Sequence, residues 1–211
     1  MRLRTFAPLL AAVLAFALAS QAAAQGAPRE EVLRIPAAGG AMMITTVMRP
    51  TGEDRRPLVV INHGSPADGS RSGMTPPRFS SLSSWFVSRG YVVALPLRRG
   101  YGETGGAWAE NYGPCGNPDY FTAGLQGAAD ITATLDFMRK QPFVSSDRSI
   151  VVGQSAGGWA TVALSSLNPP GVPGMVNFAG GRGGQQRLAS GTVGNCVSSS
   201  TGTSSLSSPV R

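Results

Sequence analysis

The segment Gly153-Gln154-Ser155-Ala156-Gly157 places a serine between two glycines in the pattern G-x-S-x-G. The strand-like run Ser149–Val152 precedes it, and a helical pattern follows. On a sharp strand-to-helix turn, the hydroxyl of Ser155 would project over the sheet end, and the glycines would keep Cβ atoms out of the way. The following helix would point its positive end at developing negative charge. The spacing predicts Ser155 as a nucleophile; the alternative is an ordinary tight turn in a chain with 28 glycines.

A second segment with chemical meaning is His63-Gly64-Ser65-Pro66, which directly follows the apolar run Leu58–Asn62. When a serine attacks an acyl carbon, the carbonyl oxygen gains negative charge, and preorganised backbone amides stabilise it. One amide comes from the residue after the nucleophile, here Ala156, and the other from a loop of this kind. We predict Ser65 as the loop donor, with Gly64 as the second choice. The alternative is an ordinary Gly-Pro turn.

Strand and helix patterns alternate along the chain. Four runs are typical of core strands: Leu58–Asn62, Tyr91–Pro96, Ser149–Val152 and Gly174–Phe178. Three segments have helical patterns: Phe79–Arg89, Asp119–Lys140 and Gln154–Leu167. Two short strands, joined by a turn at Ala38–Gly40, are expected before them, at Glu31–Pro36 and Ala41–Met48. The order predicts an α/β fold, a mainly parallel sheet with helices on both faces. Ligands bind such sheets beyond the carboxyl ends of the strands, where the loops at His63, Leu97 and Gly153 would lie.

Two of the helical patterns predict which side chains face the core. In the first helix these are Leu82, Trp85 and Phe86. In the second they are Phe121, Leu125, Ala128, Leu135 and Met138. The third core-strand run leads directly into the serine turn, so the two site segments should meet at one edge of the sheet.

Three motifs together carry a family resemblance: NHGSP at 62–66, RRGYGETGG at 98–106 and VVGQSAGG at 151–158. They resemble the α/β-hydrolase superfamily, most of all the branch around dienelactone hydrolase and the prolyl-oligopeptidase-like peptidases. The resemblance covers roughly residues 40–195. It implies a serine nucleophile that hydrolyses an ester, lactone or peptide acyl bond without a cofactor. Dienelactone hydrolase carries Cys where this chain has Ser155, so that enzyme's substrate is not carried over.

The chain departs from the family in its acid and base. In this fold the triad follows the order Ser, then Asp or Glu, then His. The chain has one histidine, His63, which precedes Ser155 and belongs to the oxyanion loop, so we expect it to be structural. No Asp, Glu or His follows Ser155. We therefore expect that the last strands of the fold are missing, through truncation or a frameshift, and that acylation is slow or absent.

The N-terminus has the pattern of an export signal. Arg2 and Arg4 precede the apolar run Leu9–Ala19, and Ala22–Ala24 supplies small residues for cleavage before Gln25. We expect residues 1–24 to be removed and the chain to be periplasmic or secreted, without a membrane span. The +7 net charge comes almost entirely from scattered arginines. No basic cluster interleaved with aromatics occurs, so nucleic-acid binding is not expected.

Two cysteines, Cys115 and Cys196, are present in a chain that we expect to be exported, so we predict a disulfide between them. The alternative is two free thiols. No CxxC pair or second His is present, so no metal site is predicted. We assign residues 25–195 to a partial hydrolase domain and 196–211 to a disordered Ser/Thr-rich tail, with little regular pattern expected beyond Gly180.

Other candidates near the expected site are weaker. Arg98, Arg99 and Glu103 would suit a carboxylate substrate, although a solvated loop or a local ion pair is the favoured interpretation. Trp108, Tyr112 and Tyr120 would line an acyl pocket or simply pack the loop. The glycines at 180–184 lack the features of a phosphate-binding loop.

Two functions remain open from the sequence. The first is an exported serine hydrolase, impaired as written, whose partner is a small-molecule or peptide acyl substrate. The second is a catalytically inactive binding module that keeps the pocket. A sheet without its last strands would also leave an apolar edge open to aggregation.

Overall fold

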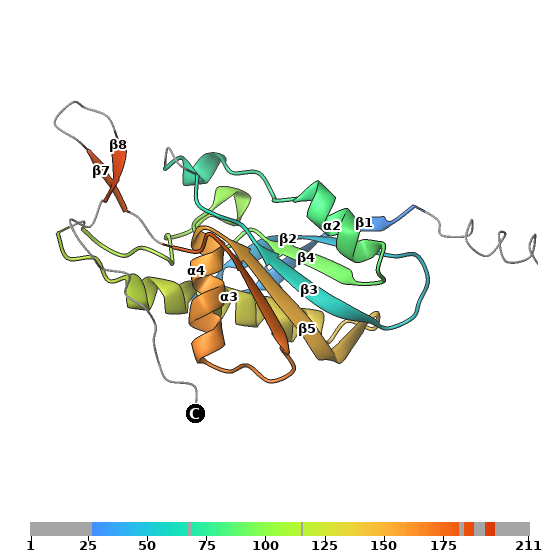
Figure 1. The fold of residues 1–211 in the computed structure, drawn as a ribbon. Helices are drawn as coiled ribbons and strands as arrows, with labels where there is room; N and C mark the ends of the chain where they lie inside the picture. Colours follow the sequence, from blue (N-terminus) through green and yellow to red (C-terminus); the bar gives the residue numbers. More distant parts are fainter. Residues whose placement is uncertain (1–26, 67–68, 115, 182–183, 188–192, 197–211) are drawn as a thin grey trace, which may run out of the picture.

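The computed structural model describes residues 27–66, 69–114, 116–181, 184–187 and 193–196 of the chain. Six strands form one sheet in the order β1-β2-β4-β3-β5-β6 (Figure 1). Their bounds are β1 Arg29–Pro36, β2 Met42–Arg49, β3 Arg56–Asn62, β4 Val92–Pro96, β5 Val144–Gln154 and β6 Gly174–Phe178. β1, β2 and β4 pair antiparallel, whereas β4, β3, β5 and β6 run parallel. The predicted mainly parallel sheet is confirmed.

The central strand β3 explains why the sheet is buried on both faces. The side chains of Leu58–Ile61 are almost completely inaccessible to solvent. In the parallel register, Val60 lies opposite Ala94 of β4 on one side and Val151 of β5 on the other. Such a continuous apolar run is what a strand between two helix layers requires.

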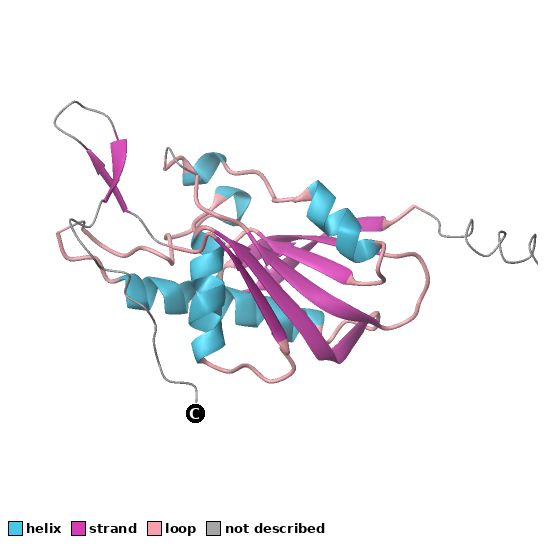
Figure 2. Cartoon of the chain, viewed as in Figure 1, coloured by secondary structure: helices cyan, strands magenta, loops and turns pink. Residues whose placement is uncertain are grey.

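Helices cover both faces of the sheet, as predicted (Figure 2). The helices are α2 Ser80–Val87, α3 Tyr120–Met138 and α4 Ala156–Ser166. α3 and α4 pack with Leu58, Val60 and Val151 in one cluster. α2 packs with Val59 and Ile61 in a second cluster on the opposite face. Three short 3₁₀ helices lie in loops: η1 Ala38–Gly40, η2 Arg71–Gly73 and η3 Gly102–Thr104.

Two aromatic side chains expected in the core are exposed, so these predictions are wrong. Trp85 is 48% exposed on α2, where the guanidinium of Arg89 lies 3.8 Å from its ring centroid. Phe121 is 59% exposed in the first turn of α3. In each helix the predicted core-facing side chains have regular helical spacing, but the sheet covers only some of them.

The edge strand β6 also differs from its predicted place in the core. It pairs with β5 over five residues, and its side chains from Val176 to Phe178 are exposed. An apolar run shows that a segment is suited to a strand, but only the strand order shows whether both of its sides are covered.

The prediction of little regular structure beyond Gly180 is wrong for two segments. β7, Gly184–Arg187, and β8, Val193–Cys196, pair antiparallel as a separate two-stranded sheet. Backbone hydrogen bonds form such a pair without an apolar pattern, so the side-chain pattern does not predict it.

Several predictions fall outside the described residues: the signal at 1–24, all of the tail predicted at 196–211 except Cys196, which ends β8, and Cys115 of the predicted disulfide with Cys196. They stay predictions. Among the described helices, none combines the length and apolar character needed to cross a bilayer.

Candidate active site

The turn between β5 and α4 holds Ser155 in a conformation that side-chain-bearing residues rarely adopt. Its backbone angles are φ 53° and ψ −119°. Positive φ in a non-glycine residue is strained and persists only where the surroundings enforce it. Here the Ser155 amide donates to the Phe178 carbonyl at 2.9 Å, and the Ser155 carbonyl accepts from the Trp159 amide at 2.9 Å. The turn is therefore fixed between the edge strand and the first turn of α4.

The two glycines of the motif allow this turn to pack against the end of β3. A Cβ on Gly153 would overlap the carbonyl oxygen of Gly157. A Cβ on Gly157 would lie 2.5 Å from the carbonyl oxygen of His63 and would also overlap that of Asn62. Both positions thus require glycine because backbone atoms, which cannot move aside easily, occupy the space.

The structure brings the predicted oxyanion loop next to the predicted nucleophile. A Cβ on Gly64 would lie only 2.9 Å from Cβ of Ser155 and 3.1 Å from the side-chain oxygen of Gln154. Ala156, the other predicted amide donor, is the buried first residue of α4. Residues from β3, β5 and α4, far apart in the sequence, therefore meet at the carboxyl edge of the sheet.

The single histidine of the sequence is held inside this loop. His63 is buried, and its Nε2 accepts from the backbone amide of Arg98 at 3.1 Å. Nδ1 must then carry the ring proton, and it lies 2.8 Å from the Gly64 carbonyl oxygen, to which it donates. Since both ring nitrogens are engaged locally, this geometry does not offer the ring as a base for Ser155.

A buried ionic network lies behind the loop. Arg98 forms an ion pair with Glu110, and both side chains are inaccessible to solvent. Nη1 of Arg98 donates to the His63 carbonyl at 2.8 Å. The hydroxyl of Tyr101 donates to Glu110 Oε2 at 3.2 Å and lies 2.6 Å from Oγ of Ser65. The network links the loop to the segment between β4 and α3.

Glu110 belongs to this network, although no feature of the sequence predicted it. Its position twelve residues after Arg98, in an irregular loop, carries no motif, and only the folded loop places its carboxylate in the core. Burial lowers the pKa of the Arg98 guanidinium, while nearby Tyr101 and Asp130 act in the opposite direction.

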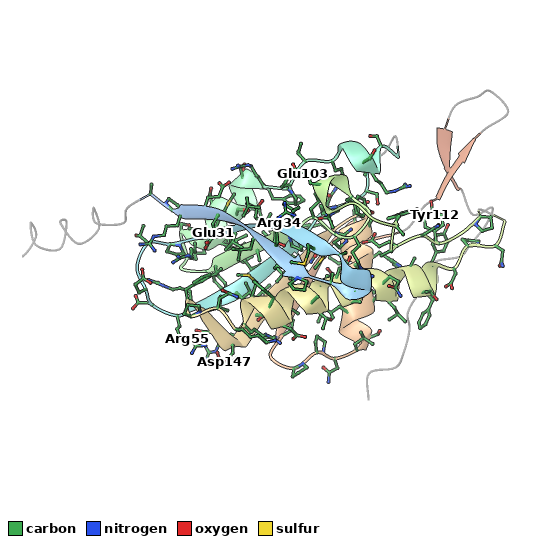
Figure 3. All side chains as sticks on the ribbon, turned by 180° about the vertical axis from the view of Figure 1, so that it is seen from behind. Glu31, Arg34, Arg55, Glu103, Tyr112 and Asp147 are labelled. Carbon is green, nitrogen blue, oxygen red and sulfur yellow. The ribbon has the colours of Figure 1, made fainter. Side chains whose placement is uncertain are left out.

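Arg98 and Arg99 form local ion pairs, which was the favoured interpretation. Arg99 pairs with Asp130 of α3, whose Oδ2 also accepts from the Arg99 backbone amide at 3.0 Å. Glu103 is exposed on η3 (Figure 3). The two arginines therefore hold the loop after β4 against the core, and each positive charge is paired with a carboxylate.

The three aromatic candidates pack together. The rings of Trp108 and Tyr112 lie 5.5 Å apart edge to face, and Tyr112 lies 5.2 Å from Tyr120. Nε1 of Trp108 donates to the Tyr101 hydroxyl at 3.2 Å. Tyr112 belongs to the loop that leads into α3 (Figure 3). Loop packing explains these aromatic side chains, as the alternative interpretation expected.

A surface pocket of about 470 Å³ lies beside the turn. Its walls come from the oxyanion loop, the segment before α2 and the residue preceding the serine: His63, Gly64, Ser65, Pro66, Met74, Thr75, Pro76, Pro77, Arg78, Phe79 and Gln154. Much of the wall is apolar, and Arg78 is paired with Glu30 at 2.7 Å. The pocket therefore suits an apolar group attached to an acyl bond. Within the described ranges, no three His, Cys, Asp or Glu side chains gather as metal ligands.

Known proteins resemble the chain in sequence. Residues 77–170 match the prolyl oligopeptidase family. The chain is 30% identical over 133 residues to dipeptidyl-peptidase 5 of Porphyromonas gingivalis, a stretch that is 60% of this chain and 17% of that protein. The chain thus spans well under two thirds of this curated relative.

Solved structures share the fold at low identity. Dipeptidyl peptidase 4 of Porphyromonas gingivalis superposes with a TM-score of 0.56 at 18% identity, over 79% of this chain and 23% of that one. A dienelactone hydrolase-like promiscuous phosphotriesterase from metagenomic libraries superposes with a TM-score of 0.53 at 16% identity, over 74% and 61% of the two chains. The chain therefore has the α/β-hydrolase fold, and residues 77–170 are similar in sequence to the prolyl oligopeptidase family.

Proposed function

We propose that this chain is an exported serine hydrolase that cleaves an ester, lactone or peptide acyl bond through Ser155. The strained backbone of Ser155, at φ 53° between β5 and α4, is the observation that carries the proposal. Strain of this kind is retained where it presents a side chain for chemistry. The neighbouring Gly64 and the buried start of α4 support the assignment of the Ser65 or Gly64 amide and the Ala156 amide as oxyanion donors.

The chemistry follows from these groups. Oγ of Ser155 forms a bond to the acyl carbon, and the carbonyl electrons move onto the oxygen, where the two amides stabilise the negative charge. The carbon–leaving-group bond then breaks, and the leaving alcohol or amine takes up the proton lost by the serine. Water adds to the acyl-enzyme in the same way, which releases the acid and restores the serine hydroxyl.

We expect this reaction to be slow in the 211-residue chain. A serine hydroxyl needs a general base at neutral pH. The sequence contains no Asp, Glu or His after Ser155, and both ring nitrogens of His63 are engaged elsewhere. The same observation favours a second candidate function, a binding module that holds an acyl compound in the pocket without turnover.

A fluorophosphonate probe tests the proposal, because it reacts with the serine nucleophile and presents a phosphoryl oxygen to the oxyanion donors, and hydroxide at raised pH can take the place of a general base. Oγ of Ser155 would bond to phosphorus, and the P–F bond would break, with fluoride and the hydroxyl proton released to solvent. The chain is expressed with residues 1–24 and recovered from the exported fraction, where a first residue of Gln25 is expected. Intact-mass spectrometry then follows labelling over pH 6–10.

We expect a single adduct that is lost in Ser155→Ala and kept in the control variant Ser88→Ala. Ser88 is exposed and directly follows the last residue of α2. Without a base, the rate should rise about ten-fold per pH unit, whereas a histidine base would make it level off near pH 7. Binding of an apolar ester to the wild-type chain and to Ser155→Ala with equal affinity, without labelling of either, would support the binding module instead.

A further inference from the structure

The oxyanion loop is tied at two points to one buried carboxylate. Glu110 accepts from Arg98 through one oxygen and from the Tyr101 hydroxyl through the other. Arg98 in turn holds the carbonyl of His63, and Tyr101 contacts the side chain of Ser65. Both ends of the three-residue segment 63–65 are therefore anchored through Glu110.

The hydrogen-bond directions in this network are determined by its chemistry. The phenol proton of Tyr101 goes to Glu110, and the phenol oxygen also accepts from Nε1 of Trp108. Because that proton is committed, the 2.6 Å contact with Ser65 requires the serine hydroxyl to donate to Tyr101. The rotamer of Ser65 is thereby restricted, and its side chain ties this residue of the loop to Tyr101.

The fold provides space for this buried pair. Gly127 of α3 lies against Glu110, since a Cβ there would be 3.2 Å from Oε1 and 2.7 Å from Cβ of Ala160. Burying an ion pair costs desolvation free energy that its attraction often only offsets, so such a pair is weak support for stability. Its contacts with residues 63–65 instead indicate that the pair positions the loop.

We infer that Tyr101, held by Glu110, is a positioning residue that fixes Ser65 so that its amide faces the reacting carbonyl oxygen. This inference rests on the proposed function, because it assumes that the Ser65 amide serves the Ser155 reaction. Tyr101 does not touch the substrate; it acts through Ser65. Displacing a catalytic donor by about 1 Å is enough to lower a rate up to ~10²-fold.

Tyr101→Phe removes only the hydroxyl, and Tyr91→Phe is the matched control. Tyr91 packs on Phe86 at the opposite face of the sheet. We expect Tyr101→Phe to lower the maximal rate of fluorophosphonate labelling by about 10- to 100-fold. The half-saturating probe concentration should change little, because binding of the probe's apolar part does not depend on Ser65. Tyr91→Phe should label like the wild type.

Amide hydrogen exchange gives a second measurement that does not depend on activity. In Tyr101→Phe we expect the Arg98 amide, which donates to His63 of the loop, to exchange about ten-fold faster, with β5 unchanged. Ser65→Ala, which removes the same bond from the other side, should show the same local loss and serves if Tyr101→Phe does not fold. Wild-type exchange at the Arg98 amide in these variants would overturn the inference. If the wild-type chain is not labelled at Ser155, the proposed function fails, and the exchange result still decides whether Tyr101 positions the loop.

Discussion

At the residue scale, the site depends on the absence of side chains as much as on Ser155 itself. Gly64, Gly153 and Gly157 each lie where a Cβ would meet the neighbouring segment. At Gly153 and Gly157 the obstructing atoms are backbone carbonyl oxygens. A side chain at either position would fit only if the backbone of the turn or of the end of β3 moved. At Gly64 the obstruction is Cβ of Ser155, so the two site segments are in direct contact.

Gly157→Ala should therefore destabilise the chain and disturb the serine turn together. We expect a loss of about 1–3 kcal/mol in the free energy of unfolding, because the new methyl group overpacks backbone atoms. Urea denaturation measures this loss. Gly73→Ala is the control, since a Cβ at Gly73 meets nothing within 4 Å. Equal unfolding midpoints for the two variants would show that the close approach of α4 to β3 is wrong.

At the element scale, α3 is the helix whose inner side chains fill most of one face of the sheet. Ile131, Leu135 and Met138 are fully buried there with strands β3, β4 and β5. The helix begins after Asp119, whose side chain accepts from the Thr122 amide at 2.9 Å and caps the first turn. Hydrogen bonds from the Thr122 side chain and then from its backbone amide lower the pKa of the Asp119 carboxyl.

Two substitutions on α3 compare the stability contribution of a buried side chain with that of an exposed one. Ile131→Ala should cost about 2–5 kcal/mol, because it leaves a cavity in the core. Phe121→Ala, at a position that is 59% exposed, should stay within about 0.5 kcal/mol of the wild type. Chemical denaturation of both variants checks the assignment. A large loss in Phe121→Ala would mean that another part of the chain covers this side chain.

At the scale of the whole molecule, the two edges of the described sheet differ in their protection. β1 carries Arg29, Glu30, Glu31 and Arg34. Figure 3 labels Glu31 and Arg34 on this strand, and charges of this kind discourage pairing with other chains. β6, with the sequence GMVNF, has no charged residue, and Val176 is 40% exposed. In the described part of the chain, β6 pairs only with β5.

Val176→Lys should therefore reduce self-association without a large change in thermal stability. Light scattering of the concentrated chain during slow heating measures the effect. Val32→Lys on β1 is the control, because Val32 is exposed at an edge that is already charged. If both variants scatter as the wild type does, the β6 edge is not where the chains meet.

The sequence by itself was sufficient for the order of strands and helices and for the serine turn. Apolar runs and helical spacing are local properties of the sequence that do not depend on the rest of the fold. For this reason β3, β4, β6 and all three helices lie within a few residues of their predicted bounds. The turn at Ser155, its flanking glycines and its approach to the loop at 63–66 were likewise predictable, because short motifs encode local backbone geometry; the catalytic roles of these residues stay predictions. β5 extends beyond its predicted run, since polar residues such as Ser145 and Asp147 give no strand signal.

Only the tertiary structure decided what surrounds these segments. Trp85 and Phe121 fit the helical spacing, but their exposure depends on how far the sheet extends beneath each helix. Glu110 became part of the site because an irregular loop brings it against Arg98 and Tyr101. Contacts between residues far apart in the sequence arise from packing and strand order. The sequence pattern therefore predicted the turn at Ser155, and the fold determined which groups hold that turn in place.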